Sequence, residues 1–225
     1  STLLYFADET PAALRLADVA GLVPHRIERH RFPDGEIQLT LPAHLPPRVV
    51  LLRSLHQPGD KLTELMLAAP TARQLGAQHL SLVAPYLAYM RQDTAFAPGQ
   101  AVSQHIVGSW LASLFDAVIT VDPHLHRVST LAQAVPAGQA IALSAAPLLG
   151  DWIAKQRPGA FLLGPDSESA QWVTQAASAQ GLPHAVCQKT RHGDHAVDIS
   201  LPAVDLRGQA VVILDDVASS GHTLA

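Results

Sequence analysis

The sequence has 225 residues, of which 48% are apolar, so it can form one large or two small domains and is not a disordered chain. Its 15 Lys and Arg residues against 19 Asp and Glu residues give a net charge of −4, which excludes a global basic field for holding a nucleic-acid backbone. No stretch approaches the roughly 18 consecutive apolar residues of a membrane-spanning helix. The single cysteine, Cys187, cannot form an internal disulfide, and the start of the chain lacks the features of a signal peptide. We therefore expect a soluble, cytoplasmic protein with neither a nucleic-acid nor a membrane partner.

The first part of the chain alternates short apolar runs with longer segments of helical period, which is typical of helices packed on a mostly parallel sheet. We predict strands at residues 3–6, 48–52, 79–84 and 117–121, and helices at residues 62–75 and 102–115. Pro70 cannot donate a hydrogen bond to the carbonyl of Met66, so the first helix should bend or be interrupted there. The apolar residues on one face of the second helix are predicted to be core: Val102, Ile106, Trp110, Leu111 and Leu114.

A second series of strands and helices follows, with strands predicted at residues 140–143, 160–163, 184–188 and 210–214. The segment before it contains Pro136 and Gly138, and we place a domain boundary there. The predicted fold class is α/β, with mostly parallel sheets flanked by helices in an N-terminal domain at residues 1–140 and a C-terminal domain at residues 141–225. The last strand lacks the crossover that a parallel sheet normally supplies, so we expect the natural chain to continue beyond Ala225.

The strongest chemical signal follows the last predicted strand. Two carboxylates, Asp215 and Asp216, precede a loop of small and hydroxyl-bearing residues that runs into a predicted helix: Ser219, Ser220, Gly221, His222 and Thr223. Backbone amides approach a phosphate where no bulky side chain intervenes, and a helix N-terminus adds a favourable dipole. The two carboxylates can accept hydrogen bonds from sugar hydroxyls or bind Mg²⁺. The alternative is an Asx or Ser cap after a strand, which explains one acid and one serine but not the whole string.

This loop resembles the phosphoribosyl-pyrophosphate loop of the type I phosphoribosyltransferase fold. Over the whole chain, further motifs resemble those of the ribose-phosphate pyrophosphokinase family, also called phosphoribosyl-pyrophosphate synthetases. They are RFPDGE at residues 31–36, PYLAYMRQD at 85–93, VDPH at 121–124, GPD at 164–166 and KTR at 189–191. The resemblance implies two phosphoribosyltransferase-like domains related by pseudo-twofold symmetry. It also implies transfer of the diphosphoryl group of Mg-ATP to the 1-hydroxyl of ribose 5-phosphate, which yields phosphoribosyl pyrophosphate and AMP.

On the ATP side, the resemblance implicates Arg91, Gln92 and Asp93. A guanidinium can stack on adenine or reach phosphate oxygens, and an amide can pair with a base edge; the alternative for Arg91 is a surface ion pair with Asp93. The family supplies three further ATP-binding residues from a neighbouring subunit, which implies a homo-oligomer, a dimer or larger, that shares each ATP site. These residues are Phe32, Asp34 and Glu36. From the residues alone, Asp34 and Gly35 predict a turn between two strands, and that prediction is compatible with both readings.

The resemblance also implies metal and catalytic residues. His124 is a candidate Mg²⁺ ligand at the end of a strand, although a lone histidine there is otherwise assigned to packing or a hydrogen bond. Asp166 is a candidate for a second metal or a ribose hydroxyl, or it caps the following helix. Lys189 and Arg191 are the candidate catalytic residues, because phosphoryl transfer needs positive charge on the moving oxygens. The alternative for this pair is a solvated hairpin tip.

The sequence departs from the family pattern within the loop. Ser219 stands where a further acid is usual, His222 replaces a usual glycine, and Pro123 precedes the candidate ligand His124. Two other functions therefore stay open. One is a phosphoribosyltransferase that consumes phosphoribosyl pyrophosphate, which needs the same loop but not the ATP-side motifs. The other is a non-catalytic regulator that associates with an active synthetase.

Overall fold

The computed structural model describes residues 1–191 and 197–217, and the side chains at 189–191 and 197–199 are not part of that description. The chain divides into two compact units, unit 1 at Ser1–Leu143 and unit 2 at Ser144–Ala225. Each unit has a hydrophobic core made of its own residues. The predicted fold class, α/β with mostly parallel sheets and flanking helices, is confirmed.

Unit 1 is built on a sheet of six parallel strands in the order β2-β1-β5-β6-β7-β8. A separate antiparallel hairpin, β3–β4, follows β2 along the chain. The strands are β1 (Thr2–Tyr5), β2 (Val23–Arg26), β3 (Glu28–Arg31), β4 (Ile37–Thr40), β5 (Arg48–Leu52), β6 (His79–Ala84), β7 (Ala117–Val121) and β8 (Gln139–Leu143). Strand β8 was predicted to open the second series, and this prediction is wrong because β8 pairs with β7 at the edge of the first sheet.

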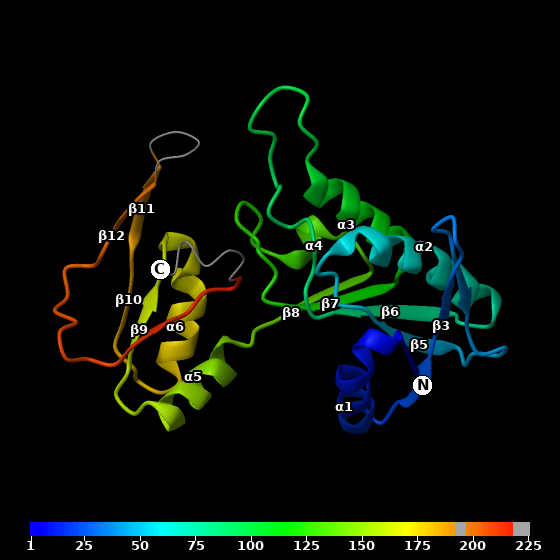
Figure 1. Cartoon of the computed structure of the whole chain (residues 1–225), viewed down its shortest axis with the longest axis horizontal. Helices are drawn as coiled ribbons and strands as arrows, with labels where there is room; N and C mark the ends of the chain where they lie inside the picture. The colour runs from blue at the N-terminus through cyan, green and yellow to red at the C-terminus, as the bar shows by residue number, and fades with distance from the viewer. Residues whose placement is uncertain (192–196, 218–225) are drawn as a thin grey trace. The chain divides into compact units, whose positions relative to one another are not determined.

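Helices cover both faces of the unit 1 sheet, with α2, α3 and α4 on one face and α1 on the other (Figure 1). The unit also has a short 3₁₀ helix, η1, after β1. The helices are η1 (Ala7–Glu9), α1 (Thr10–Ala20), α2 (Pro58–Gln74), α3 (Ser103–Leu114) and α4 (Leu131–Ala134). Helix α2 runs through Pro70 without interruption. Pro70 lies on the exposed side of the helix, where water can satisfy the carbonyl that lacks its usual donor, while Ala68, Ala69 and Ala72 are buried against the sheet.

Three of the five residues predicted as the core face of helix α3 lie in the core or pack against it, but Ile106 does not. The buried residues of α3 are Gln104, Gly108 and Leu111, whereas Ile106 is 60% exposed. The reason is a close approach to α4: a Cβ atom on Gly108 would lie 1.8 Å from the carbonyl oxygen of Ala134. Because only a residue without a side chain fits there, α3 turns its glycine toward α4 and Ile106 toward solvent.

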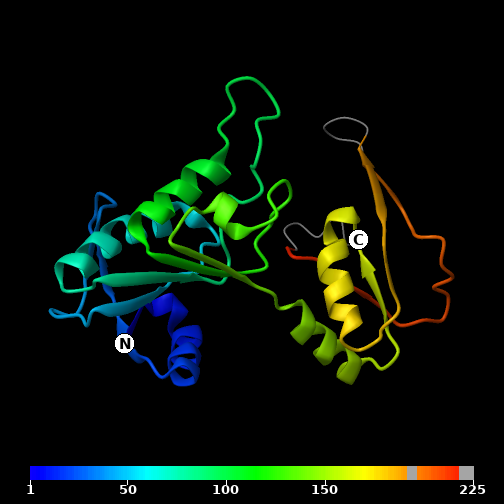
Figure 2. The same cartoon turned by 180° about the vertical axis from the view of Figure 1, so that it is seen from behind.

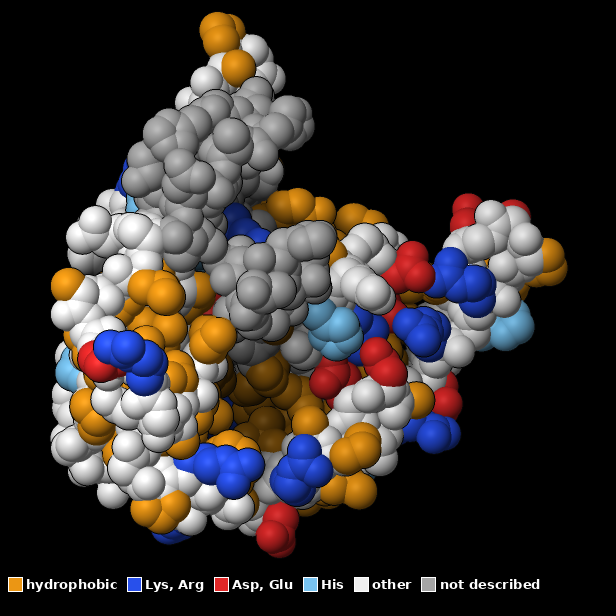
Figure 3. Space-filling model, turned by 60° about the vertical axis from the view of Figure 1, so that its left-hand side comes forward, with side chains coloured by type: hydrophobic (Ala, Val, Ile, Leu, Met, Phe, Trp, Pro, Cys, Tyr) orange, Lys and Arg blue, Asp and Glu red, His pale blue; other side chains and the backbone are white. Residues whose placement is uncertain are grey.

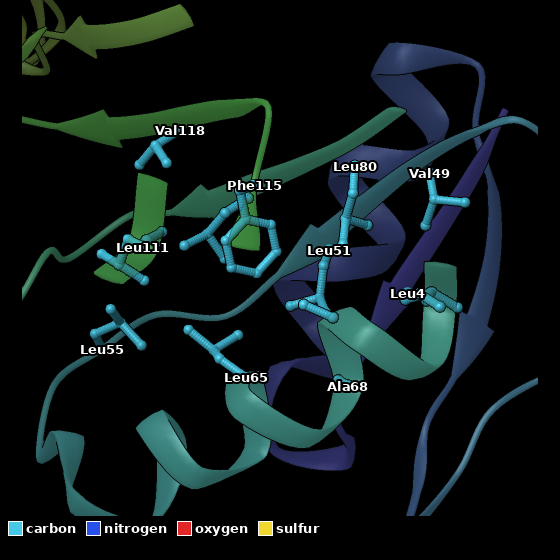
Figure 4. Packing of buried hydrophobic residues seen from close by; sticks show 14 of the residues in the cluster. Leu4, Val49, Leu51, Leu55, Leu65, Ala68, Leu80, Leu111, Phe115 and Val118 are labelled. Atoms are coloured by element: carbon cyan, nitrogen blue, oxygen red, sulfur yellow. The ribbon is translucent and has the colours of Figure 1, made fainter. Parts of the chain in front are cut away.

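The main core of unit 1 lies between the sheet and helices α2 and α3 (Figure 4). Leu65 and Ala68 of α2 lie beside Leu51 of β5, and Leu111 of α3 lies near Val118 of β7. All of these side chains are fully buried. Burial of a large aliphatic side chain contributes about 1.5–3 kcal/mol, so this cluster fixes the strand ends from which the candidate site residues project.

Unit 2 contains a three-stranded parallel sheet in the order β10-β9-β13, two helices packed on one another, a short 3₁₀ helix and an antiparallel hairpin, β11–β12 (Figure 2). Its helices are α5 (Ala146–Gln156), η2 (Ser167–Ser169) and α6 (Ala170–Ser178). Its strands are β9 (Phe161–Gly164), β10 (His184–Val186), β11 (Gln188–Arg191), β12 (Val197–Ser200) and β13 (Val211–Ile213). The single strand predicted at residues 184–188 is thus two strands, which Cys187 separates.

Hydrophobic side chains also reach the surface. Val19 is 88% exposed, and on α5 Leu148 and Trp152 are 70% and 61% exposed. On the face drawn in Figure 3, hydrophobic side chains lie among charged and polar ones. Among the described helices, none is both long and apolar enough to cross a membrane.

Candidate functional site

The carboxyl ends of three adjacent strands in unit 1 carry unusual backbone. Gln57, Tyr89 and Asp122 follow β5, β6 and β7 respectively, and their φ angles are 50°, 66° and 40°. Side-chain-bearing residues avoid this left-handed region, and each such position costs of order 1–3 kcal/mol. Strain of this kind clusters at functional sites, and ligands of parallel α/β sheets bind beyond the carboxyl ends of the strands. This edge of the sheet is therefore the candidate site of unit 1.

The hairpin β3–β4 places Phe32, Asp34 and Glu36 on one tight turn. The Phe32 amide donates to the Glu36 carbonyl at 2.8 Å, the Gly35 amide donates to the Phe32 carbonyl at 3.0 Å, and Gly35 has a φ of 96°. Asp34 accepts a hydrogen bond from the Glu36 amide at 3.1 Å. The predicted turn is confirmed, and all three side chains are exposed, so they are available to another molecule.

The loop after β6 carries the other three residues predicted to bind ATP. Arg91 is exposed, and the Gln92 side chain donates to the Thr94 carbonyl at 3.1 Å. Asp93 is different, because only 2% of its side chain is exposed and it forms an ion pair with Arg127 at 2.5 Å. Arg91 is thus accessible to a ligand, Gln92 is half-buried and held by its own loop, and Asp93 is engaged within the protein.

The loop after β7 begins at the strained Asp122, whose amide donates to the Leu143 carbonyl at 2.8 Å. Pro123 and His124 follow and are half-buried. The loop therefore presents His124 at the same sheet edge as the loop after β6, since β6 and β7 are parallel neighbours.

A buried charge cluster near β1 and β5 was missed from the sequence. Arg53, which directly follows β5, is 1% exposed and pairs with Asp8 at 2.7 Å, with Glu9 at 3.5 Å and with the fully buried Glu64 at 2.5 Å. Glu64 also pairs with Arg29 of the β3–β4 hairpin. Burial alone would raise the pKa of Asp8, but the hydrogen bond and charge of Arg53 lower it below the usual value. The cluster ties the hairpin to the sheet edge.

Lys61 of α2 lies beside this cluster. It donates to the Ser54 carbonyl at 2.7 Å and is 7% exposed. Burial and the positive charge of Arg53 lower the pKa of Lys61 below its usual value. An arginine directly after an apolar strand is the signal that could have revealed the cluster, because a charge at that position needs buried partners.

In unit 2, Asp166 and Asp215 lie beyond the adjacent strands β9 and β13. Asp166 caps the turn that follows it, accepting hydrogen bonds from the amides of Glu168 at 3.0 Å and Ser169 at 3.2 Å. Asp215 accepts from the Asp216 amide at 3.0 Å. The pKa of Asp215 is raised to about 6, mainly because the carboxylate is partly buried and also because Asp216 and Asp166 carry negative charge nearby. The three carboxylates therefore form an acidic group at the carboxyl edge of this sheet.

The remaining predicted site residues are only partly covered by the structure. Lys189 and Arg191 belong to β11, where they stand opposite Ile199 and Val197 in the register with β12. Their side chains are outside the description. The loop residues lie entirely beyond the described ranges: Ser219, Ser220, Gly221, His222 and Thr223.

The acidic group of unit 2 suits a divalent cation, since a dication would relieve the repulsion that raises the pKa of Asp215. Within residues 1–191 and 197–217, no three or more His, Cys, Asp or Glu side chains converge in a ready-made metal cage. Mg²⁺ does not require one, because it commonly binds one or two carboxylates together with waters and substrate phosphates.

Comparison with known proteins decides the family. Residues 2–114 match the N-terminal domain of ribose phosphate pyrophosphokinase. A ribose-phosphate pyrophosphokinase of Methanopyrus kandleri is 35% identical over 214 residues, which cover 93% of this chain and 72% of that protein. The chain belongs to the ribose-phosphate pyrophosphokinase family. The resemblance inferred from the motifs, and the prediction of an enzyme, are thus confirmed.

Other relatives agree with this assignment to the ribose-phosphate pyrophosphokinase family. The enzyme of that name from Methanosarcina mazei is 33% identical, over 95% of this chain and 70% of the relative. The crystal structure of phosphoribosylpyrophosphate synthetase from Mycobacterium smegmatis aligns with a TM-score of 0.81 at 20% identity, over 100% of this chain and 74% of that one. At that identity the likeness supports the fold alone.

Proposed function

We propose that this protein transfers the diphosphoryl group of Mg-ATP to the 1-hydroxyl of ribose 5-phosphate, forming phosphoribosyl pyrophosphate and AMP for nucleotide biosynthesis. The observation that carries the proposal is the 35% identity to a ribose-phosphate pyrophosphokinase across 93% of the chain. That match covers most of unit 1 and most of unit 2.

Unit 1 binds the nucleotide in this proposal. Arg91 is exposed and carries the fixed positive charge that adenine stacking or phosphate binding requires, and Gln92 offers an amide next to it. The exposed Phe32, Asp34 and Glu36 of the hairpin serve the ATP site of a second copy of the chain. The functional form is then a homo-oligomer, a dimer or larger.

Unit 2 binds the pentose phosphate. Asp215 and Asp216 accept hydrogen bonds from the ribose hydroxyls, and the backbone amides and hydroxyls of residues 219–223 bind the 5-phosphate. His124 in unit 1 is the proposed contact for one Mg²⁺ ion, and Asp166 in unit 2 is the proposed contact for a second, separate ion. Bound Mg²⁺ would neutralise charge on the phosphate oxygens. Lys189 and Arg191 bring positive charge close to the oxygens of the transferred diphosphoryl group, which stabilises a loose transition state.

The test is an assay of AMP release from ATP in the presence of ribose 5-phosphate. Lys189→Ala should lower the turnover rate by about 10³-fold, the usual effect of removing a charge that stabilises the transition state. Lys155→Ala, at an exposed position on α5, is the matched control and should retain full turnover. Asp215→Asn should raise the KM for ribose 5-phosphate more than the KM for ATP. Normal turnover by the Lys189→Ala protein would contradict the assigned role.

A regulatory role is the second candidate, because Ser219 and His222 depart from the family loop. In that case the purified protein would release no AMP by itself but would change the turnover of an active synthetase when mixed with it. Conversion of phosphoribosyl pyrophosphate and a nucleobase to a nucleotide, without any ATP requirement, would instead identify a phosphoribosyltransferase.

A further inference from the structure

Asp93 joins two loops at the carboxyl edge of the unit 1 sheet. Its Oδ1 atom accepts a hydrogen bond from Nη1 of Arg127 at 2.5 Å, and its Oδ2 atom accepts one from the Arg127 backbone amide at 3.1 Å. Asp93 belongs to the loop after β6, while Arg127 belongs to the loop after β7. One carboxylate therefore binds both the backbone and the side chain of the neighbouring loop.

The environment of this carboxylate leaves little room for a ligand. Only 2% of the Asp93 side chain is exposed, and Nδ1 of His126 lies 4.0 Å from Oδ2. The Arg127 side chain is 49% exposed and its guanidinium lies over the ring of Phe96 at 5.8 Å. Because a buried carboxylate is stable only when its oxygens are paired, the contact with Arg127 satisfies Asp93 without any bound molecule.

The loop after β6 is held independently by α3. The backbone amide of Gln104 donates to the Gln92 carbonyl at 3.1 Å, and the Gln104 side chain, which is fully buried, donates to the Met90 carbonyl at 2.9 Å. These bonds flank Arg91. The loop after β6 is thus attached to a helix of the core, and Asp93 in turn attaches the loop after β7 to it.

We propose that Asp93 is a positioning residue, which acts through Arg127 to fix the loop of His124 relative to Arg91 and Gln92 and does not itself contact the nucleotide. The proposal rests on the function proposed above, in which Arg91, Gln92 and His124 serve Mg-ATP. It changes the role predicted for Asp93 from binding ATP to aligning the groups that bind it.

The test is a double-mutant cycle of Asp93→Asn and Arg127→Gln, read as kcat and as the KM values for ATP and ribose 5-phosphate. Each single change should lower kcat/KM for ATP by about 10- to 100-fold, the effect of a displacement near 1 Å, and leave the KM for ribose 5-phosphate unchanged. The double variant should be no worse than the worse single variant, because both changes break the same contact. Arg127→Lys should restore part of the loss.

The exposed pair Asp205 and Arg207 provides a matched control. Their side chains are 65% and 92% exposed and pair at 2.9 Å, so Asp205→Asn and Arg207→Gln should change neither parameter. Independent, multiplicative losses in the Asp93 and Arg127 variants would overturn the proposal, because they would mean that Asp93 contacts the substrate by itself.

Hydrogen exchange of residues 122–130 separates this proposal from the proposed function. Exchange there should accelerate at least tenfold in both single variants, whether or not the protein releases AMP. Unchanged exchange would overturn the positioning role. A wild-type protein that is inactive, with accelerated exchange in the variants, would refute the proposed function while leaving the contact between the loops intact. If Asp93→Asn does not fold, the half-exposed Arg127→Gln and Arg127→Lys variants decide the same question.

Discussion

Replacing Glu64 by alanine should destabilise unit 1 strongly. Glu64 is fully buried on α2, where it pairs with Arg53 of the sheet edge and with Arg29 of the β3–β4 hairpin. Alanine would leave the 1% exposed guanidinium of Arg53 without one of its counter-charges. The hairpin would at the same time lose its buried attachment to α2.

The expected magnitude follows from the remaining partners. Removing one member of a buried ion pair costs about 3–5 kcal/mol when it leaves the other charge uncompensated. Arg53 retains Asp8 at 2.7 Å and Glu9 at 3.5 Å, so we expect the lower end of that range. Glu64→Gln preserves volume and one acceptor and should cost about half as much, in the range of a hydrogen bond to a charged group.

Hydrogen exchange of the buried amides in β5 and β6 measures this loss within unit 1. A change of about 3 kcal/mol corresponds to exchange that is faster by roughly 10²-fold. The matched control is Glu28→Ala, which breaks an ion pair with Arg26 at the surface. The side chain of Arg26 is 51% exposed and that of Glu28 is 61% exposed. That change should alter the free energy of opening by less than about 1 kcal/mol.

Two results would refute the reasoning. One is a Glu64→Ala protein whose exchange in β5 is within about fivefold of the wild type, which would mean that the buried charges contribute no net stability. The other is a Glu28→Ala protein as unstable as Glu64→Ala, which would mean that burial does not govern the strength of these ion pairs.

Three further predictions concern packing, capping and pH. Gly108→Ala places a Cβ atom 1.8 Å from the Ala134 carbonyl oxygen and should lower stability by about 1–3 kcal/mol in thermal unfolding, whereas Gly59→Ala, which meets nothing within 4 Å, should not. Asp166→Ala removes the side chain that accepts hydrogen bonds from two backbone amides, and it should lower the stability of unit 2 by about 1 kcal/mol. Hydrogen exchange in α6 measures this loss, and Asp166→Asn should recover most of it. Because burial and neighbouring charges raise the pKa of Asp215 from 3.8 to about 6, the folded chain binds more protons than the unfolded chain in that interval, and stability falls as the pH rises through it. Asp215→Asn should flatten this slope in urea titrations of unit 2, and an unchanged slope would show that another group is responsible.

The central strands could be predicted from the sequence because each is an apolar run bounded by turn residues. Strands β5, β6 and β7 have the predicted bounds. Strand β2 was not predicted, since an edge strand of mostly exposed residues with a proline, Val23–Arg26, shows no apolar pattern. Assignment of β8 to the wrong sheet has a similar cause: a local pattern predicts a strand but carries no information about its pairing partner.

The candidate site was predictable where its residues lie close together in the chain, as in the turn of Phe32 to Glu36. It was not predictable where it depends on pairs distant in sequence. Asp93 and Arg127 are 34 residues apart, and Arg29 and Glu64 are 35 apart. The exposure of Ile106 on α3 was missed for the same reason, because the neighbour that requires Gly108 is on another helix.

The left-handed backbone at Gln57, Tyr89 and Asp122 has a consequence for laboratory evolution. Glycine adopts this geometry without steric strain, and relief of that strain outweighs the extra backbone entropy that glycine loses on folding. Selection of a random library for heat tolerance alone would therefore enrich glycine at these codons. Selection for catalysis would retain the original side chains wherever they touch a substrate. Sequencing both pools would therefore separate residues kept for what they bind from residues that merely tolerate their geometry.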